Sequence, residues 1–146
     1  MLASIMLAAT TMVAPSKAET DAIFAAAGAT RRGADWTWSR EDRQAKLRID
    51  LYRDLNGDGL VDVVVVEDSA MHGAAGQAFA LVAQGPKGKW RKLHQSSGVP
   101  EVLDARKGSW PDIRIAGPGF CFPVVRWNGR AYANHRTEYL GKPCKR

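Results

Sequence analysis

The stretch Val61-Asp62-Val63-Val64-Val65-Val66-Glu67 contains five valines in seven residues. β-Branched residues favour strands, and an unbroken apolar run is typical of a strand that is buried on both faces. We therefore predict a central strand over residues 61–67. This strand indicates that the fold is mainly β.

The segments around this strand show the two-residue alternation of half-buried strands. Leu47, Ile49 and Leu51 alternate with charged residues, and Trp36 and Trp38 alternate with polar ones. Because successive side chains of a strand point to opposite faces, each apolar set lies on one face. Further strands are predicted at residues 77–84, 89–93, 110–116, 122–127 and 130–135.

Turns, loops and one helix complete the predicted order of elements. Asn128-Gly129 predicts a type I′ hairpin turn, and residues 96–107 are predicted to be a loop with at most one helical turn. A short helix is predicted over residues 21–27, with Thr20 or Asp21 as its cap. The expected fold is an antiparallel meander or small sandwich of about seven strands, with this short helix at its N-terminal end.

A weak internal repeat is also present. Residues 60–65 resemble residues 110–115, and each segment is followed by a strand, a glycine-containing turn and an aromatic strand. We interpret these as two related β units, with chance similarity between two hairpins as the alternative. Two units are too few for a closed propeller, which needs about four to eight blades.

The N-terminal segment resembles a secretory signal. Residues 1–15 contain no charged residue and are rich in Leu, Ala and Met. Ser16-Lys17-Ala18 then offers small residues at the positions that signal peptidases recognise. We expect a signal peptide over residues 1–18 and a single β-rich domain over residues 19–146, in the periplasm or secreted. A buried N-terminal helix is the alternative.

The two cysteines, Cys121 and Cys144, fit export. An even count outside the cytosol predicts a disulfide, which would stabilise the fold by roughly 3 kcal/mol, and two buried free thiols are the alternative. A zinc site is not expected, because neither cysteine has a nearby cysteine partner and the three histidines are scattered.

The formal net charge of +6 limits the classes of partner. The basic residues cluster at residues 87–92 and 142–146, which favours anionic surfaces such as envelope polymers, or simply a solvated basic face. No nucleic-acid-binding motif is present, so nucleic acid is not an expected partner. No apolar run is long enough for a membrane-spanning helix, so stable membrane insertion is not expected.

One loop carries a specific chemical pattern, Asp54-Leu55-Asn56-Gly57-Asp58-Gly59-Leu60-Val61-Asp62. Calcium binds six to eight hard oxygen ligands, and this spacing can wrap a short loop around one ion. The expected ligands are the side chains of Asp54, Asn56, Asp58 and Asp62 and the backbone carbonyl of Leu60. A metal-free hairpin turn, in which the Asp and Asn side chains accept backbone amides, is the alternative.

The pattern D-x-N-x-D-G-x-x-D followed by a hydrophobic strand resembles the calcium loops of FG-GAP or VCBS repeats. The resemblance implies a calcium ion in a β-hairpin loop, with the last Asp among its ligands. It does not imply a propeller, because there is one such loop and the corresponding segment, residues 106–109, lacks the acids. Most of the mature chain also resembles a family of small exported proteobacterial proteins, and this resemblance implies no known activity.

Signals for catalysis are weak, so we expect that the chain is not an enzyme. No GxSxG, HExxH or P-loop motif is present. Glu67, Asp68 and His72 lie close together in sequence and could form an acid–base pair, but a satisfied surface cluster is favoured. The five tryptophans could line a sugar- or peptide-binding groove, although most are expected to be at least partly buried.

The expected function is an exported, calcium-stabilised binding module of the cell envelope, with an envelope protein or glycan as its partner. Two alternatives stay open. The first is an inhibitor of an envelope hydrolase such as lysozyme, in which residues 68–76 or residues 117–120 would form the contact loop. The second is a hydrolase of cell-wall or sugar substrates, which would need acidic groups converging in a cleft.

Overall fold

The valine run forms β4 (Asp62–Asp68), the second strand of a four-stranded antiparallel sheet. Val63–Val66 are at most 1% exposed, so β4 is buried on both faces, as its unbroken apolar run predicted. It pairs with β3 (Leu47–Arg53) and β5 (Gln77–Gln84), and β6 (Trp90–Ser97) adds to β5. This sheet therefore follows the order of the chain, as a meander does.

A second antiparallel sheet follows directly. It has the order β11-β10-β9-β8-β7 and consists of β7 (Val99–Val102), β8 (Ile113–Ala116), β9 (Phe122–Trp127), β10 (Tyr132–Tyr139) and β11 (Lys142–Pro143). The fold is thus mainly β, as predicted. The two segments matched by the internal repeat end up in equivalent places, because one leads into β4 and the other into β8, the second strand of each meander.

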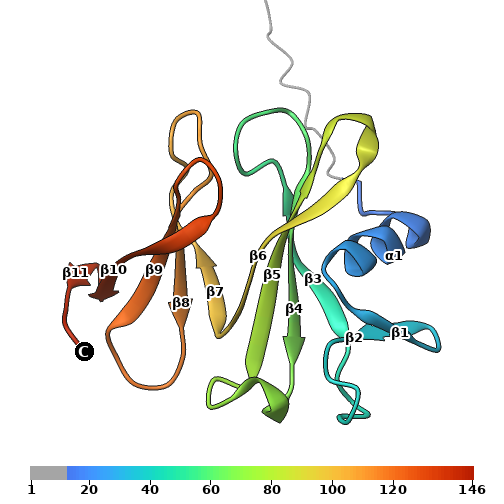
Figure 1. Cartoon of the computed structure of the whole chain (residues 1–146), viewed down its shortest axis with the longest axis horizontal. Helices are drawn as coiled ribbons and strands as arrows, with labels where there is room; N and C mark the ends of the chain where they lie inside the picture. The colour runs from blue at the N-terminus through green and yellow to red at the C-terminus, as the bar shows by residue number, and fades with distance from the viewer. Residues whose placement is uncertain (1–12) are drawn as a thin grey trace, which may run out of the picture.

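The computed structural model describes residues 13–146, and Figure 1 shows them in three layers. The inner faces of the two sheets pack against each other around Phe79, Leu81, Ile113 and Tyr132. The outer face of the first sheet is covered by α1 (Lys17–Ala26) and by the hairpin β1 (Thr30–Arg32) and β2 (Asp35–Thr37). Because side chains alternate along β4, its valines contribute to both cores.

Several predicted boundaries differ from the structure. The helix predicted over residues 21–27 begins at Lys17, because Ser16 caps it by accepting the Glu19 amide. Residues 13–146 form eleven strands rather than about seven. The additional strands are short and gain their regular backbone by pairing with neighbours, which no local pattern reveals.

The prediction of a loop over residues 96–107 was wrong in its first half. β6 continues to Ser97, and β7 follows after a single residue and pairs with β8. The hairpin between β9 and β10 is confirmed, but Asn128-Gly129 is not its central pair. The Asn128 amide bonds the Ala131 carbonyl, so Gly129 and Arg130 are central, and of these only Gly129 has a positive φ.

The predicted disulfide between Cys121 and Cys144 is present and ties the residues after β11 to the start of β9. Most of the predicted signal peptide, residues 1–12, lies outside the described residues. The predicted cleavage point after Ala18 falls within the first turns of α1. No helix among residues 13–146 is both long and apolar enough to cross a bilayer.

Gly98 is the point at which the chain leaves the first sheet and enters the second. Its φ is +124°, and its amide donates to the Gln77 carbonyl at 2.7 Å. A β-carbon at this position would lie 2.4 Å from Cγ2 of Ile115 and 3.1 Å from the Ala116 carbonyl oxygen. The two sheets can approach this closely only because residue 98 has no side chain.

We predict that Gly98→Ala lowers the free energy of unfolding by about 2–4 kcal/mol, measured by urea denaturation, because it adds a clash to an unfavourable φ. Gly129→Ala is the matched control, since Gly129 also has a positive φ but nothing lies within 4 Å of the added carbon. The control should lose only about 1 kcal/mol. Equal losses in the two variants would contradict the steric role of residue 98.

Candidate metal centre

The loop between β3 and β4 brings together three of the predicted ligands. Asp54, Asp58 and Asp62 each offer one carboxylate oxygen, and these oxygens all lie within 4.8 Å of one another. Asp54 and Asp58 are exposed, whereas Asp62 is buried. The acidic cluster therefore opens to solvent on one side and reaches the end of the central strand on the other.

The exposed part of the loop is shaped by its own side chains. Asp54 accepts the amides of Gly57 and Gly59, each at 2.8 Å. Asp58 accepts the Leu60 amide at 2.8 Å, and the Asn56 side chain donates to Asp58 at 3.4 Å. These turns are compatible with a metal-free hairpin, which was the alternative considered from the sequence. The proposed role of the Leu60 carbonyl stays a prediction.

Asp62 is different, because it is fully buried. Its Oδ2 accepts the Leu55 amide at 2.8 Å, but its buried Oδ1 has no hydrogen-bond partner among residues 13–146. Burial raises the pKa of Asp62 to about 6 and repulsion from Asp58 and Asp54 adds to the rise, whereas the backbone amides of Leu55 and Gln84 oppose it. A buried charged oxygen without a partner is costly, so either a proton or a bound cation would stabilise Asp62.

The second sheet contains an equivalent carboxylate. Asp104 and Asp112 have the same spacing as Asp54 and Asp62, and Asp112 immediately precedes β8. Asp112 is also buried, but Arg126 binds both of its oxygens, at 2.9 and 2.8 Å.

Two further guanidinium groups complete the surroundings of Asp112. Arg136 donates to it at 2.8 Å, and Arg106, from the loop before β8, lies 3.9 Å away. The hydrogen bonds from Arg126 and Arg136 lower the pKa of Asp112 to about 2, against the effect of burial. The chain thus neutralises this carboxylate with its own cations. In the described part of the chain, no Lys or Arg forms an ion pair with the acidic cluster of the first loop.

The arginines continue as a ladder across the outer face of the second sheet. Arg136 also donates to Glu138 at 3.1 Å, Arg114 donates to Glu138 at 2.7 Å, and Arg114 pairs with Glu101. Sequence reasoning missed this network. Its only local signal was the alternation of charged and apolar residues in strands, which does not identify cross-strand partners.

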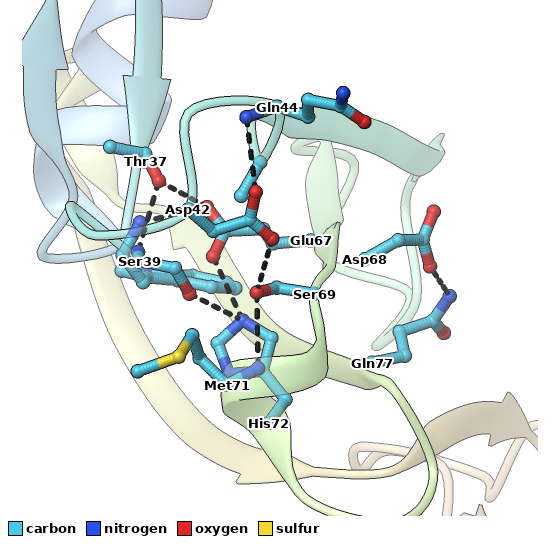
Figure 2. A network of polar contacts seen from close by, with 12 residues as sticks. Thr37, Ser39, Asp42, Gln44, Glu67, Asp68, Ser69, Met71, His72 and Gln77 are labelled. Atoms are coloured by element: carbon cyan, nitrogen blue, oxygen red, sulfur yellow. Dashed lines mark hydrogen bonds and ion pairs between the residues drawn. The ribbon is translucent and has the colours of Figure 1, made fainter.

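Two of the three acid–base candidates, Glu67 and His72, form a largely buried network rather than a surface cluster (Figure 2). Glu67 is fully buried and accepts the Thr37 hydroxyl and the Trp38 amide, each at 2.8 Å. His72 Nε2 lies 2.8 Å from Glu67 and 3.3 Å from the Ser39 hydroxyl. Burial opposes ionisation of Glu67, but these polar neighbours outweigh it and hold its pKa below the usual value.

This network does not have the geometry of a serine nucleophile. In a Ser-His-acid relay the acid and the serine contact opposite ring nitrogens, so that a proton can pass through the imidazole. Here Glu67 and Ser39 share Nε2 of His72. The third candidate, Asp68, is exposed and pairs with Arg48 and Gln77 instead. The network therefore positions the histidine ring and anchors the loop that follows β4.

Comparisons with known proteins add no assignment. No protein-family model matches the chain, and neither the curated proteins nor the solved structures that were compared contain a match.

We predict that Arg126→Gln flattens the acid dependence of stability. Asp112 has a pKa near 2 in the fold and 3.8 as its reference value, so it contributes stability that is complete above about pH 4 and is lost as the pH falls through 2. Between these pH values the variant should lose about 1–2 kcal/mol less unfolding free energy than the wild type, measured by urea denaturation.

Arg130→Gln is the control for this experiment, because Arg130 lies in the same hairpin and forms no ion pair with residues 13–146. It should keep the wild-type slope. An unchanged slope in Arg126→Gln would show that Arg126 does not set the ionisation of Asp112.

Proposed function

We propose that the chain is an exported binding module of the cell envelope whose fold is stabilised by one calcium ion in the loop of residues 54–62. The observation that carries the metal is the buried Oδ1 of Asp62, which has no hydrogen-bond partner in the described part of the chain and lies beside the carboxylates of Asp54 and Asp58. The contrast with Asp112 supports it. The same position in the second meander is neutralised by arginine, and the first has no such cation among the described residues.

Calcium fits this donor set better than the common transition metals. All the expected donors are oxygens, from the side chains of Asp54, Asn56, Asp58 and Asp62 and the carbonyl of Leu60. Hard oxygen donors suit calcium and magnesium, whereas zinc and copper favour nitrogen and sulfur. The exposed mouth of the loop leaves room for water to complete the six to eight ligands of calcium.

The ion would have a structural role. It would offset the repulsion among three close carboxylates and satisfy the buried oxygen at the start of β4. The loop connects β3 to β4, and β4 contributes valines to both hydrophobic cores. An ordered loop would therefore fix the register of β3 on β4. The disulfide between Cys121 and Cys144 is compatible with an oxidising compartment and supports the proposed export.

The test is the thermal stability of the protein with calcium and with EDTA. Saturating calcium should stabilise the wild type by about 2–3 kcal/mol. Asp58→Asn should shift the melting temperature in opposite directions in EDTA and in calcium. In EDTA it should melt at a higher temperature than the wild type, because it removes one of three repelling charges. In calcium it should melt at a lower temperature, because it loses a ligand.

Asp35→Asn is the control, since Asp35 is also exposed but lies in the β1–β2 hairpin, outside the acidic cluster. It should keep the full response to calcium. A wild-type melting temperature that is the same in calcium and in EDTA would rule out calcium as a structural element.

A second candidate function is the inhibition of an envelope hydrolase such as lysozyme. The observation that favours it is an exposed aromatic tip on a braced loop. Phe120 is 66% exposed, and the next residue, Cys121, is held by the disulfide. In a lysozyme assay on cell walls, the wild type should inhibit and Phe120→Ser should not. Leu140→Ser, which changes another exposed apolar residue, should still inhibit, and a wild type without effect would exclude this function for lysozyme.

A further inference from the structure

We propose that a groove at one end of the two sheets binds an extended segment of a partner protein. The groove is at the end opposite the loop of residues 54–62, and the bound segment carries both acidic and bulky apolar side chains. This inference rests on the proposed binding function and deepens it by naming the surface and the chemistry of the partner. The groove lies between the loop after β4, residues 69–76, and the loop after β8, residues 117–121.

The two loops that the sequence singled out separately form opposite walls of one groove. Its volume is about 660 Å³, and its floor is formed by the end of β6 and by Ile115. A β-carbon at Gly117 would lie 3.5 Å from that of Ala75, so the loops are in contact at one point. Met71 and Phe120, which are 59% and 66% exposed, stand on the two sides.

Both walls are held in place before any partner binds. In the first wall, the Ser69 amide bonds the Gly76 carbonyl at 2.9 Å, and the Ser69 side chain accepts the Met71 amide. In the second wall, Cys121 has a φ of +63° and is tied to Cys144 by the disulfide. A preformed groove costs less ordering entropy on binding than a flexible one does.

The charge of the groove indicates an acidic partner. Among the described residues that line it, none is Asp or Glu, and the charged or titratable ones are His72 and Arg146. An adjoining hollow shares Arg146 and adds His135 and Arg136, again without an acidic residue. Because His72 contacts the Glu67 carboxylate and Arg136 is paired with Asp112 and Glu138, the cation of these two hollows that forms no ion pair with residues 13–146 is Arg146, and a carboxylate of a partner would pair with it.

The second meander as a whole also contains more basic than acidic residues. Residues 99–146 contain nine Lys and Arg against four Asp and Glu, whereas residues 19–98 contain eleven of each. Of the four acids, Asp112, Glu101 and Glu138 are already paired with arginines. This distribution would steer an acidic partner toward the half of the molecule that holds the groove's second wall.

The Glu67–Ser39–His72 network positions a residue that lines the groove. His72 lines the groove, and its Nε2 is occupied by Glu67 and Ser39. Its other nitrogen, Nδ1, forms no hydrogen bond with residues 13–146 and is free to contact a bound segment. The buried network thus fixes the ring of one groove residue (Figure 2).

The shape of the site favours a chain segment over a membrane surface. Met71 and Phe120 both line a concave site of about 660 Å³, which has room for a bulky apolar side chain of a partner. Leu140, the most exposed apolar residue among those described outside the N-terminal segment, does not line the groove but lies at the turn between β10 and β11, next to Tyr139, whose ring contacts that of Phe120. Buried aromatic and Met contacts surrounded by polar groups are typical of protein interfaces.

The experiment is selection from a random peptide library displayed on phage, with the full chain in calcium as bait. Enriched peptides should carry Asp or Glu beside a bulky apolar residue. Their affinity for the double variant Met71→Ser/Phe120→Ser should fall by at least about tenfold, and for Arg146→Gln by about threefold. Leu140→Ser is the matched control and should bind as the wild type does.

Several results would overturn the proposal. They are no enrichment, enrichment of neutral or basic peptides, and equal binding to the double variant. Two further measurements cover other occupants of the groove. Sedimentation with anionic lipid vesicles, or self-association in analytical ultracentrifugation, that is lost in the double variant while peptides do not bind would assign the groove to a membrane or to a second copy.

The calcium proposal and the groove proposal fail separately. Calcium stability is read from melting temperature, and peptide binding is read in calcium and again in EDTA. Peptide binding without any effect of calcium on the melting temperature would contradict only the calcium proposal. If calcium stabilises the protein but no acidic peptide is selected, only the groove proposal is contradicted.

Discussion

The structure depends on the burial of β4 on both faces. Its four consecutive valines, Val63–Val66, leave no polar face, so each side of the strand needs an apolar cover. Helix α1 and the β1–β2 hairpin provide one cover, and the second meander provides the other. The three layers follow from this one requirement. Gly98 makes the close packing of the two sheets possible, because it lets the chain pass from one sheet to the next within a single residue.

The two meanders meet the same electrostatic problem in different ways. Each has a buried aspartate where its second strand begins, Asp62 in the first and Asp112 in the second. Arginines from neighbouring strands neutralise Asp112, so its ionisation is secured within the chain. Asp62 lies among further acids instead, and one of its oxygens has no partner among residues 13–146. One buried aspartate is therefore neutralised within the chain, and the other lies beside two further carboxylates without a cation among the described residues.

The topology places the two proposed sites at opposite ends of the first sheet. In an antiparallel meander, the loops before and after β4 lie at opposite ends of the strand, as Figure 1 shows. The acidic loop before β4 is at one end. The loop after it faces the loop after β8 across the groove at the other end. A bound ion could stabilise the sheet without entering the proposed recognition surface, and a partner could bind without displacing the ion.

The central strand, the period-two strands and the acidic loop could be predicted from the sequence because they depend on neighbouring residues, and the disulfide because there are two cysteines. The short strand β7 and the centre of the β9–β10 turn could not, because the register of pairing with the adjacent strand sets them. The fold had to be known to see that Asp62 has a buried oxygen without a partner among residues 13–146 while Asp112 does not, and that Met71 and Phe120 line one groove. Burial and charge pairing depend on which segments meet in space, and here those segments are tens of residues apart in the chain.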